Sequence, residues 1–189
     1  MDIDRIGLLG NKGSGKDTLA DYLVKEKQYI KYSFATPVKE IAKNLFNLNE
    51  EQLNGNLKEV IDDRWGVSPR VMFQRIGTEF GQYKIYELFP EIKDKIAAKG
   101  LWVKLFEDFL KENKDKNIVI ADVRFNHEVN ILKKHNFNII KINRNTELND
   151  SHISENEIRL IKHIDYEIDN NGTKEQLYSQ FDNFIYIPF

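Results

Sequence analysis

Hydrophobic positions along the chain follow two spacings that alternate from one end to the other. Short apolar runs typical of buried strands are separated by longer segments in which apolar residues recur every three or four positions, as on one face of a helix. The expected strands span residues 5–9, 29–34, 117–121, 138–142 and 166–168. Because strands that alternate with helices usually form a parallel sheet, we predict an α/β fold with a parallel central sheet flanked by helices.

Several of the expected helices carry recognisable start signals. Thr36-Pro37 and Ser68-Pro69 each place an N-cap residue before a proline at the first helical position. Ser154 and Glu157 have the spacing of a capping box, and Thr173 is expected to cap the last helix. The expected helices cover or begin at residues 18–27, 36, 68, 83–98, 101–113, 125–135, 154–162 and 173.

The helix that begins at Thr36-Pro37 is expected to bury one face. The residues on that face are Val38, Ile41, Ala42 and Leu45. The following residues, 47–66, are polar and lack a strong period, so we expect them to be mobile or only partly helical.

The composition indicates one cytoplasmic domain that does not coat nucleic acid or cross a membrane. The chain has 189 residues, and 41% of them are hydrophobic, enough for one buried core. Its 28 basic and 30 acidic residues nearly balance, whereas proteins that bind nucleic-acid polymers usually carry a basic surplus. The absence of cysteine excludes disulfides, thiolate zinc sites and cysteine nucleophiles. No apolar run approaches the roughly 18 residues of a membrane helix, and the acidic first residues do not resemble a signal peptide.

The segment after the first strand has the G-x-x-x-x-G-K pattern of a phosphate-binding loop. Its glycines let backbone N–H groups turn toward phosphate oxygens, and the helix that follows adds its positive N-terminal end. An apolar strand before the loop and an amphipathic helix after it are the context that this motif requires, which a chance glycine-rich turn would lack. We predict ATP binding by Asn11, Lys12, Gly13, Ser14, Gly15, Lys16, Asp17 and Thr18. Lys16 is the expected catalytic cation, because its ammonium can follow the charge of the transferred phosphoryl group.

Asp17 departs from the usual motif, which has a serine or threonine on magnesium at that position. Thr18 supplies a hydroxyl one residue later, so we predict both residues as metal ligands for Mg²⁺ and Asp17 as a catalytic residue. Asp17 could hold the metal through water or act as a base toward the acceptor. It could equally be an acid in the first helical turn that the helix dipole favours.

A second carboxylate, Asp122, follows the buried strand near residue 118. Ligands of open α/β sheets gather at the carboxyl ends of the strands, so we predict that Asp122 binds magnesium through water. Arg124, two residues later, could clamp a phosphate with two parallel hydrogen bonds. The alternative for both residues is a solvated turn with a structural ion pair.

Taken in order, the motifs resemble the deoxynucleoside monophosphate kinases of tailed phages, which are relatives of dephospho-CoA kinase. The matching blocks are Gly10–Thr18 with its Gly-Lys-Asp-Thr ending, Phe34–Glu40, Arg70–Glu79, Trp102, Asp122–Glu128, His152–Glu155 and Ile168–Thr173. The resemblance covers nearly the whole chain. It implies a three-layer P-loop kinase domain over residues 1–189, with a helical acceptor-binding insertion at about 37–100 and a short LID at about 144–163.

The resemblance also implies ATP- and Mg²⁺-dependent transfer of a phosphoryl group to a deoxynucleoside 5′-monophosphate. The implied acceptor-binding residues are Phe34, Lys39, Arg70, Gln74, Thr78, Glu79, Trp102 and Arg124. Arg70 would take the monophosphate, while Gln74 and Glu79 could read base or sugar edges. Arg124 would bridge the acceptor and transferred phosphates, Arg144 would be a catalytic arginine on the LID side, and Asn171 and Gly172 would contact ATP.

Two positions qualify this assignment. Gln82 stands where members of the family often carry an arginine. The loss of that cation would weaken the contact with the acceptor phosphate or shift acceptor choice. Trp102 could be a core residue instead of a platform on which the base stacks.

Two alternative functions remain open from the sequence. The acceptor could be dephospho-CoA, another small alcohol or a ribonucleotide. The chain could instead be a nucleotide-driven switch, but the N-K-x-D motif of guanine-binding switches is absent, since Asn113-Lys114-Asp115 has the wrong spacing. In each case we expect small-molecule nucleotides as partners, compatibility with a homodimer, and a cytoplasmic location, which is the host cytoplasm if the source is viral.

Overall fold

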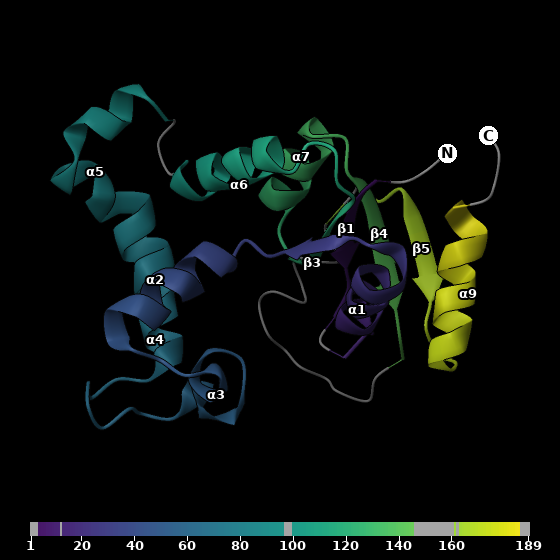
Figure 1. Ribbon diagram of the computed structural model, residues 1–189, viewed down its shortest axis with the longest axis horizontal. Coiled ribbons are helices and arrows are strands. Elements are labelled where there is room, and N and C mark those ends of the chain that lie inside the picture. The colour runs from purple at the N-terminus through teal and green to yellow at the C-terminus, as the bar shows by residue number, and fades with distance from the viewer. Residues whose placement is uncertain (1–3, 12, 97–99, 146–160, 162, 186–189) are drawn as a thin grey trace. The chain divides into compact units, whose positions relative to one another are not determined.

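The computed structural model describes residues 4–11, 13–96, 100–145, 161 and 163–185. The chain forms two compact units (Figure 1). Residues Met1–Ser33 and Asp115–Phe189 make up the sheet unit, and residues Phe34–Lys114 make up the helical unit. The helical unit includes the range 37–100 that the sequence assigns to acceptor binding, and that functional assignment stays a prediction.

The sheet unit contains one five-stranded sheet in which every pair of neighbours is parallel. Its strands are β1 (Arg5–Leu9), β2 (Ile30–Tyr32), β3 (Ile118–Val123), β4 (Asn138–Asn143) and β5 (Tyr166–Asp169), in the spatial order β2-β3-β1-β4-β5. The predicted α/β class and the parallel sheet are therefore confirmed. Because all strands run the same way, their carboxyl ends meet at one edge of the sheet.

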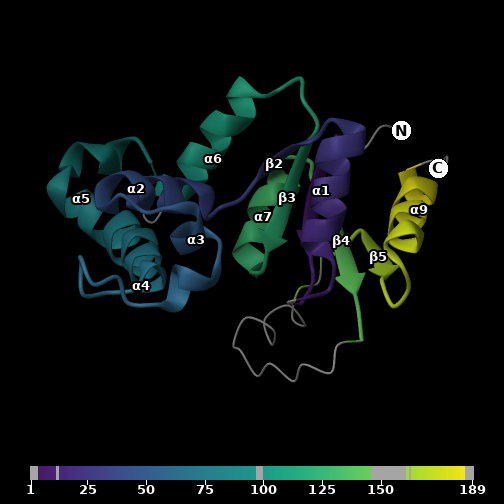
Figure 2. The same ribbon diagram turned by 60° about the horizontal axis from the view of Figure 1, so that its bottom comes forward.

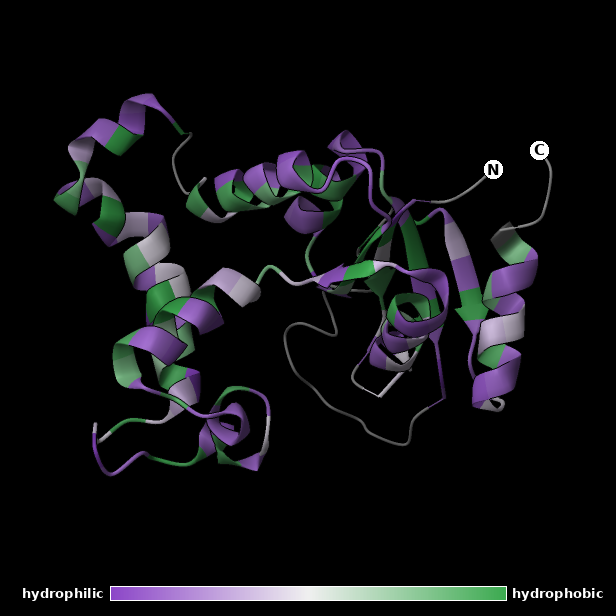
Figure 3. Cartoon of the chain, viewed as in Figure 1, coloured by the Kyte–Doolittle hydropathy of each residue, from purple (hydrophilic) through white to green (hydrophobic). Residues whose placement is uncertain are grey.

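Among the described residues of the sheet unit, the helices that flank the sheet are α1 (Lys16–Lys27), α7 (Asn126–Lys134) and α9 (Lys174–Ile185). Ile6 and Leu8 of β1 pack in one core with residues of α1 and α9, so these two helices cover the same face. Gly7, which faces the other way, lies against Leu132 of α7. Both Figure 1 and Figure 2 show α9 beside β5. Figure 3 shows the hydrophobic character of β1 and β4, as expected for strands covered on both faces.

The helical unit packs short helices around a small core. Its elements are α2 (Thr36–Phe46), α3 (Glu50–Leu53), the 3₁₀ turn η1 (Asn56–Glu59), α4 (Pro69–Gln74), the π-helical stretch η2 (Arg75–Lys84), α5 (Ile85–Leu88), the 3₁₀ turn η3 (Pro90–Asp94) and α6 (Leu101–Glu112). Residues from α2, α4 and η2, among them Val38, Met72 and Ile76, form the buried cluster. The segments α4, η2 and α5 follow one another without a break.

Three details of the sequence prediction are wrong in this unit. Ala35 precedes α2 as its N-cap residue, and Thr36 is already helical. Ile41 and Leu45 are 36% and 64% exposed, because α2 packs against α4 and η2 mainly through the narrower row that contains Val38. The helix expected at residues 83–98 ends at Leu88, since a residue that precedes a proline, here Pro90, is disfavoured in helical conformation.

Residues 47–66 are partly helical, as predicted, and a buried carboxylate holds their fold. Asp62 accepts hydrogen bonds from Gln52 Nε2 at 2.6 Å and from Arg64 Nε and Nη2 at 2.9 and 2.6 Å. The hydrogen bonds with Arg64 hold the pKa of Asp62 well below its usual range. This network adds to the packing of Leu48 and Leu53, which are buried in the core of the helical unit.

Candidate nucleotide-binding site

The carboxyl edge of the sheet gathers the site residues that the sequence places in this unit. They are the loop 10–15 after β1, Asp122 at the end of β3 with Arg124 beyond it, Arg144 after β4, and Asn171 and Gly172 after β5. Ser33, which the sequence analysis did not single out, follows β2 at the same edge. In open parallel sheets, ligands bind at this edge. Lys12, the helix expected from Ser154, and the expected LID beyond Asn145 lie outside the described residues, apart from Ile161 and His163.

The phosphate-binding loop is already curled around its own lysine. Lys16 Nζ donates hydrogen bonds to the backbone oxygens of Gly10 at 2.6 Å and Asn11 at 2.8 Å. The Ser14 N–H donates to Asn11 O at 3.1 Å and closes a tight turn. Gly15, with φ of 104°, adopts the left-handed conformation that glycine tolerates. A bound triphosphate would compete for the Lys16 ammonium and release these two carbonyls.

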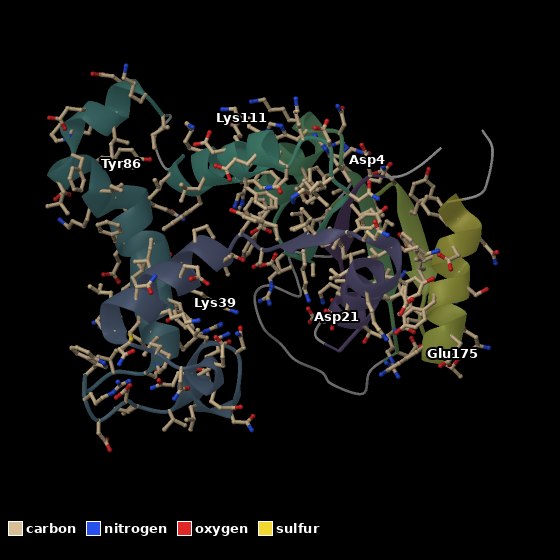
Figure 4. All side chains as sticks on the ribbon, viewed as in Figure 1. Asp4, Asp21, Lys39, Tyr86, Lys111 and Glu175 are labelled. Carbon is tan, nitrogen blue, oxygen red and sulfur yellow. The ribbon has the colours of Figure 1, made fainter. Side chains whose placement is uncertain are left out.

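Asp17, in the first turn of α1, forms an ion pair with Lys31 of β2. Its carboxylate lies 3.2 Å from Lys31 Nζ of β2. The same ammonium lies 3.0 Å from Asp21, one helical turn farther along α1, where Figure 4 labels it. The Asp17 side chain is 81% exposed, so this ion pair contributes little to stability. Lys31 was not singled out in the sequence, because only the pairing of β2 brings it to the start of α1.

Two carboxylates lie near the end of β3 in different surroundings, Asp122 on the strand itself and Glu128 in the first turn of α7. Asp122 accepts a hydrogen bond from Ser33 Oγ. Glu128 Oε2 accepts from the backbone N–H groups of Arg124 at 2.8 Å and Phe125 at 3.1 Å. Burial raises the pKa of Glu128 to about 7, although both N–H groups favour the ionised form.

Asp122 lies at the C-terminal end of β3, as predicted, and the strand continues one residue beyond it. The strand extends because Val123 still pairs with Leu9 of β1. Burial, together with the Asp122 charge, raises the pKa of Tyr32 to about 12. Asp122 therefore sits in a polar but enclosed position at the strand end.

A cavity of ≈ 340 Å³ opens beside the phosphate loop. Its lining comes from two strand ends, with Gly10, Asn11 and Ser14 on the β1 side and Lys141, Ile142, Asn143, Arg144 and Asn145 on the β4 side. Lys141 and Arg144 give this concave surface a positive charge that suits a phosphorylated ligand. Sequence reasoning identified Arg144 but missed Lys141, which looks like an ordinary outward-facing strand residue.

The turn after β5 is tied to the same region. Asn171 Oδ1 accepts a hydrogen bond from the backbone N–H of Asn145 at 2.7 Å, next to the cavity. Thr173 and Gln176 exchange hydrogen bonds in a capping box at the start of α9, which confirms Thr173 as the predicted cap. Asn171 and Gly172, predicted to contact ATP, therefore lie in an ordered turn at the functional edge.

The predicted acceptor residues other than Arg124 all belong to the helical unit. Arg70, Gln74 and Thr78 follow one another at four-residue intervals along α4 and η2, so they share one side of the helix. Gln74, Thr78 and Glu79 are exposed. π-Helical segments are rare in proteins, and those that occur often lie at functional sites.

Trp102 is built into the helical unit. Its indole N–H donates to Gly77 O at 2.7 Å, and its ring lies against Gly81, where any Cβ would collide with the ring. The ring also packs beside the small buried cluster. These contacts favour the core role for Trp102 that the sequence left open.

The remaining acceptor candidates have partners of their own. Lys39 Nζ donates to Asn54 Oδ1 at 2.6 Å (Figure 4 labels Lys39 on α2). The Phe34 ring lies 5.1 Å from the Phe106 ring, and Arg70 Nε lies 4.0 Å from Glu59 Oε1. Arg70 is therefore held only weakly and is available to an anion.

Within residues 4–11, 13–96, 100–145, 161 and 163–185, no three His, Asp or Glu side chains gather into a metal-binding group. Magnesium in nucleotide sites usually takes only one or two protein ligands, with phosphate and water supplying the rest. In the same part of the chain, no helix has both the length and the apolar character needed to cross a membrane.

Comparisons with known proteins agree with this geometry. The family model described as deoxynucleotide monophosphate kinase matches residues 5–65 and 53–181. A relative from Acanthamoeba polyphaga mimivirus, named for deoxynucleotide monophosphate kinase, is 40% identical over 181 residues and covers 93% of this chain and 92% of its own. The deoxynucleotide monophosphate kinase of Enterobacteria phage T4 is 26% identical over 234 residues, covering 94% and 97%.

A solved structure supports the fold alone. Shikimate kinase from Aquifex aeolicus matches with a TM-score of 0.52 and 16% identity, over 96% of this chain and 95% of the other. The family match and the mimivirus relative cover most of the sequence and include the phosphate loop. The chain belongs to the deoxynucleotide monophosphate kinase family.

Proposed function

We propose that this phosphotransferase moves the γ-phosphoryl group of ATP to the 5′-phosphate of a deoxynucleoside monophosphate, with Mg²⁺ as its cofactor. The observation that carries the proposal is the preformed phosphate loop, in which Lys16 lies within hydrogen-bonding distance of two loop carbonyls. Family membership supplies the nucleotide substrates and the ATP donor. Family membership also favours this reaction over phosphoryl transfer to dephospho-CoA or to a small alcohol, and over a nucleotide-driven switch.

The donor nucleotide fits the functional edge of the sheet unit. The phosphates would lie on the loop N–H groups, and Lys16 would meet the charge on the transferred group. Arg144, which lines the cavity, would contact the same phosphates, while the turn with Asn171 and Gly172 would contact the nucleoside. Catalytic arginines of this kind raise rates by on the order of a thousandfold or more.

The residues around Asp122 fit magnesium by their chemistry. Mg²⁺ prefers oxygen ligands, and the Asp122 carboxylate and the Thr18 hydroxyl both lie at the functional edge of the sheet. Ser33 already fixes one oxygen of Asp122. When bound, the metal neutralises charge on the donor phosphates.

Asp17 is better suited to a positioning or metal role than to that of a base. The acceptor is a phosphate monoester, whose second pKa of about 6 leaves its attacking oxygen largely ionised at neutral pH. Phosphoryl transfer to such an oxygen requires no proton removal. Asp17, which pairs with Lys31, would therefore act through water on magnesium or simply orient the start of α1.

The acceptor would be selected by the helical unit. Arg70, loosely held by Glu59, would bind the monophosphate, while Gln74, Thr78 and Glu79 present polar groups for base or sugar edges. Lys39 and Phe34 would flank the same site, and Arg124 of the sheet unit would contact the transferred phosphoryl group. The Gln82 side chain offers no cation, so Arg70 would carry the phosphate contact within this unit.

The central test is ADP release from ATP with dTMP, dGMP, dCMP or dAMP as acceptor. We expect acceptor-dependent ADP with at least one of them, and Lys16→Ala should abolish it. Lys25→Ala is the matched control, because Lys25 is an exposed cation in the last turn of the same helix. No acceptor-dependent ADP with any of the four would refute the proposal.

Arg70→Ala separates the two substrates. The KM for the acceptor should rise far more than the KM for ATP, because Arg70 lies in the helical unit and the phosphate loop does not. Lys84→Ala is the control, since it removes a cation that pairs with Glu87 in the same continuous helix. Equal effects on both KM values would remove Arg70 from the acceptor site.

Cellular location and oligomeric state are two further parts of the proposal. Both named relatives are viral, so we propose that the protein works in the cytoplasm of a host cell. A homodimer also stays a proposal, and light scattering after size-exclusion chromatography would test it.

A further inference from the structure

Asn170 is a buried amide at the functional edge of the sheet that the reaction itself leaves unexplained. It directly follows β5 and is only 4% exposed, whereas asparagine is mostly found on protein surfaces. Its backbone N–H donates to Asn143 O of β4 at 2.8 Å, so the residue is fixed at the end of the sheet. An amide buried in this way requires a specific hydrogen-bonding partner.

The partner of the Asn170 side chain is the phosphate loop. Asn170 Nδ2 donates to Ser14 O at 2.7 Å, in a buried hydrogen bond between residues 156 positions apart. The same amide group fills the space where a Cβ on Gly15 would lie. The loop and the turn after β5 are thus in direct contact, and Gly15 must be a glycine for this reason as well as for its φ.

This hydrogen bond sets the direction of an N–H group in the loop. The peptide between Ser14 and Gly15 is planar and trans, so its C=O and N–H point in opposite directions. When Asn170 holds the Ser14 carbonyl on one side, the Gly15 N–H must point to the other side. In a phosphate loop, backbone N–H groups serve the ligand and the carbonyls must turn away from it.

We infer that Asn170 is a positioning residue for the donor phosphates, because its amide fixes the Ser14–Gly15 peptide with the Gly15 N–H directed into the loop. The inference rests on the proposed function only in naming ATP as the ligand. Asn171, the next residue, accepts from Asn145 N–H beside the cavity. The turn after β5 therefore holds the phosphate loop with one residue and the segment after β4 with the next.

Binding of inorganic tripolyphosphate and of ADP to Asn170→Ala and Asn170→Asp tests the role directly by calorimetry. Loss of one directed N–H contact should weaken both ligands in Asn170→Ala by about tenfold. Asn170→Asp should weaken them further, since a carboxylate would repel the Ser14 carbonyl and the phosphates. The affinity for dTMP should not change in either variant.

Gln180→Ala is the matched control. Gln180 Nε2 donates to Asp169 O at 2.8 Å, so it is also an amide that holds the end of β5, but it is exposed. Its removal should leave tripolyphosphate affinity unchanged. Urea denaturation of every variant separates loss of folding from loss of the loop geometry.

Two outcomes would overturn the inference. One is unchanged tripolyphosphate and ADP affinity in Asn170→Ala with a lowered free energy of unfolding, which would make Asn170 merely structural. The other is an equal loss of affinity in Gln180→Ala. If Asn170→Asp does not fold, Asn170→Ala alone decides. A protein that binds ADP as expected but releases none with any acceptor would refute the proposed function and leave this inference standing.

Discussion

The sheet unit carries its candidate nucleotide-binding residues at the ends of paired strands, whereas the helical unit carries its candidate residues along a helix with irregular hydrogen bonding. In the sheet unit, the position of each strand end follows from its neighbours and from an apolar core that includes Leu8 and Ile140. In the helical unit, the geometry depends on a few specific contacts, such as those of Asp62 and Trp102. The donor site should therefore tolerate change in the helical unit, while acceptor selection should not.

The largest effect that separates the units is expected from Asp62→Asn. The change removes the charge that binds both Arg64 nitrogens and accepts from Gln52. We expect the Tm to fall by about 5 °C or more and the acceptor KM to rise, while ADP affinity is unchanged. Thermal denaturation and calorimetry measure the two effects.

Asp63→Asn is the control for this change, because Asp63 is the exposed neighbour of the same charge. It should leave both the Tm and the acceptor KM as in the wild type. If Asp62→Asn lowered the affinity for ADP as much as the affinity for the acceptor, the distinction between the two units would be wrong.

A smaller effect is expected from Gly81→Ala. The added methyl group collides with the Trp102 ring, so the ring or the helix must shift, at a cost of about 2 kcal/mol in free energy of unfolding. The acceptor KM should rise because η2 carries Thr78 and Glu79. Urea denaturation and acceptor kinetics check both.

Gly77→Ala provides the comparison within the same helix. A Cβ at Gly77 meets Val38 only at 3.6 Å, which is an ordinary contact. Its free energy of unfolding should equal or exceed that of the wild type, since alanine favours the helix. If both alanine variants were equally destabilised, the contact with Trp102 would not be the cause.

Within the sheet unit, Glu128→Gln should change how stability depends on pH. Because burial raises the pKa of Glu128 to about 7, the folded protein binds more protons than the unfolded chain between about pH 4.5 and pH 7. The free energy of unfolding of the wild type should therefore fall across this range, by about 1–2 kcal/mol for a partly exposed group, and level off above it. Asp122 and Arg124 are the charged groups that act on it.

Glu128→Gln should lack this fall, since its amide oxygen can still accept from both N–H groups but does not titrate. Denaturation in urea at several pH values measures the slope. The surface change Glu26→Gln should retain the wild-type slope. An unchanged slope in Glu128→Gln would show that another group titrates.

The smallest effect is expected from Lys31→Ala. Exposed ion pairs stabilise proteins by less than about 1 kcal/mol, so the free energy of unfolding should hardly change. Asp17 would lose a competing cation, and the Mg²⁺ concentration for half-maximal activity should decrease. Lys25→Ala is the control, and an unchanged Mg²⁺ requirement in Lys31→Ala would argue against a metal role for Asp17.

Local patterns carried most of the fold into the sequence prediction. Each of the five strands could be recognised, because apolar runs such as Arg5–Leu9 and Asn138–Asn143 are local features. The phosphate loop could be recognised for the same reason, since its glycines and lysine lie within a few residues. Pro90 also predicts the end of α5, but the helical spacing of apolar residues around it favoured a longer helix.

The contacts that complete the site join residues far apart in the sequence, and the spacing of hydrophobic residues does not predict them. Asn170 reaches Ser14 across most of the chain, and Ser33 reaches Asp122 only because β2 and β3 are neighbours. The exposure of Ile41 could not be predicted, because it depends on which helices pack against α2. A sequence places residues at strand ends, but the order of the strands decides which of them meet.

The central position of β1 has a consequence for synthesis. Ile6 pairs with Val119 and Asn138, so the strand that carries the phosphate loop has no partner until β3 has been made, and it is paired on both edges only after β4 has been made. At about 5–20 residues per second, this apolar strand waits on the order of ten seconds on the ribosome. During that interval the nascent chain exposes an apolar strand with unpaired edges, which is a known route to aggregation. The phosphate loop is among the first parts of the site to be made and among the last to be held in place.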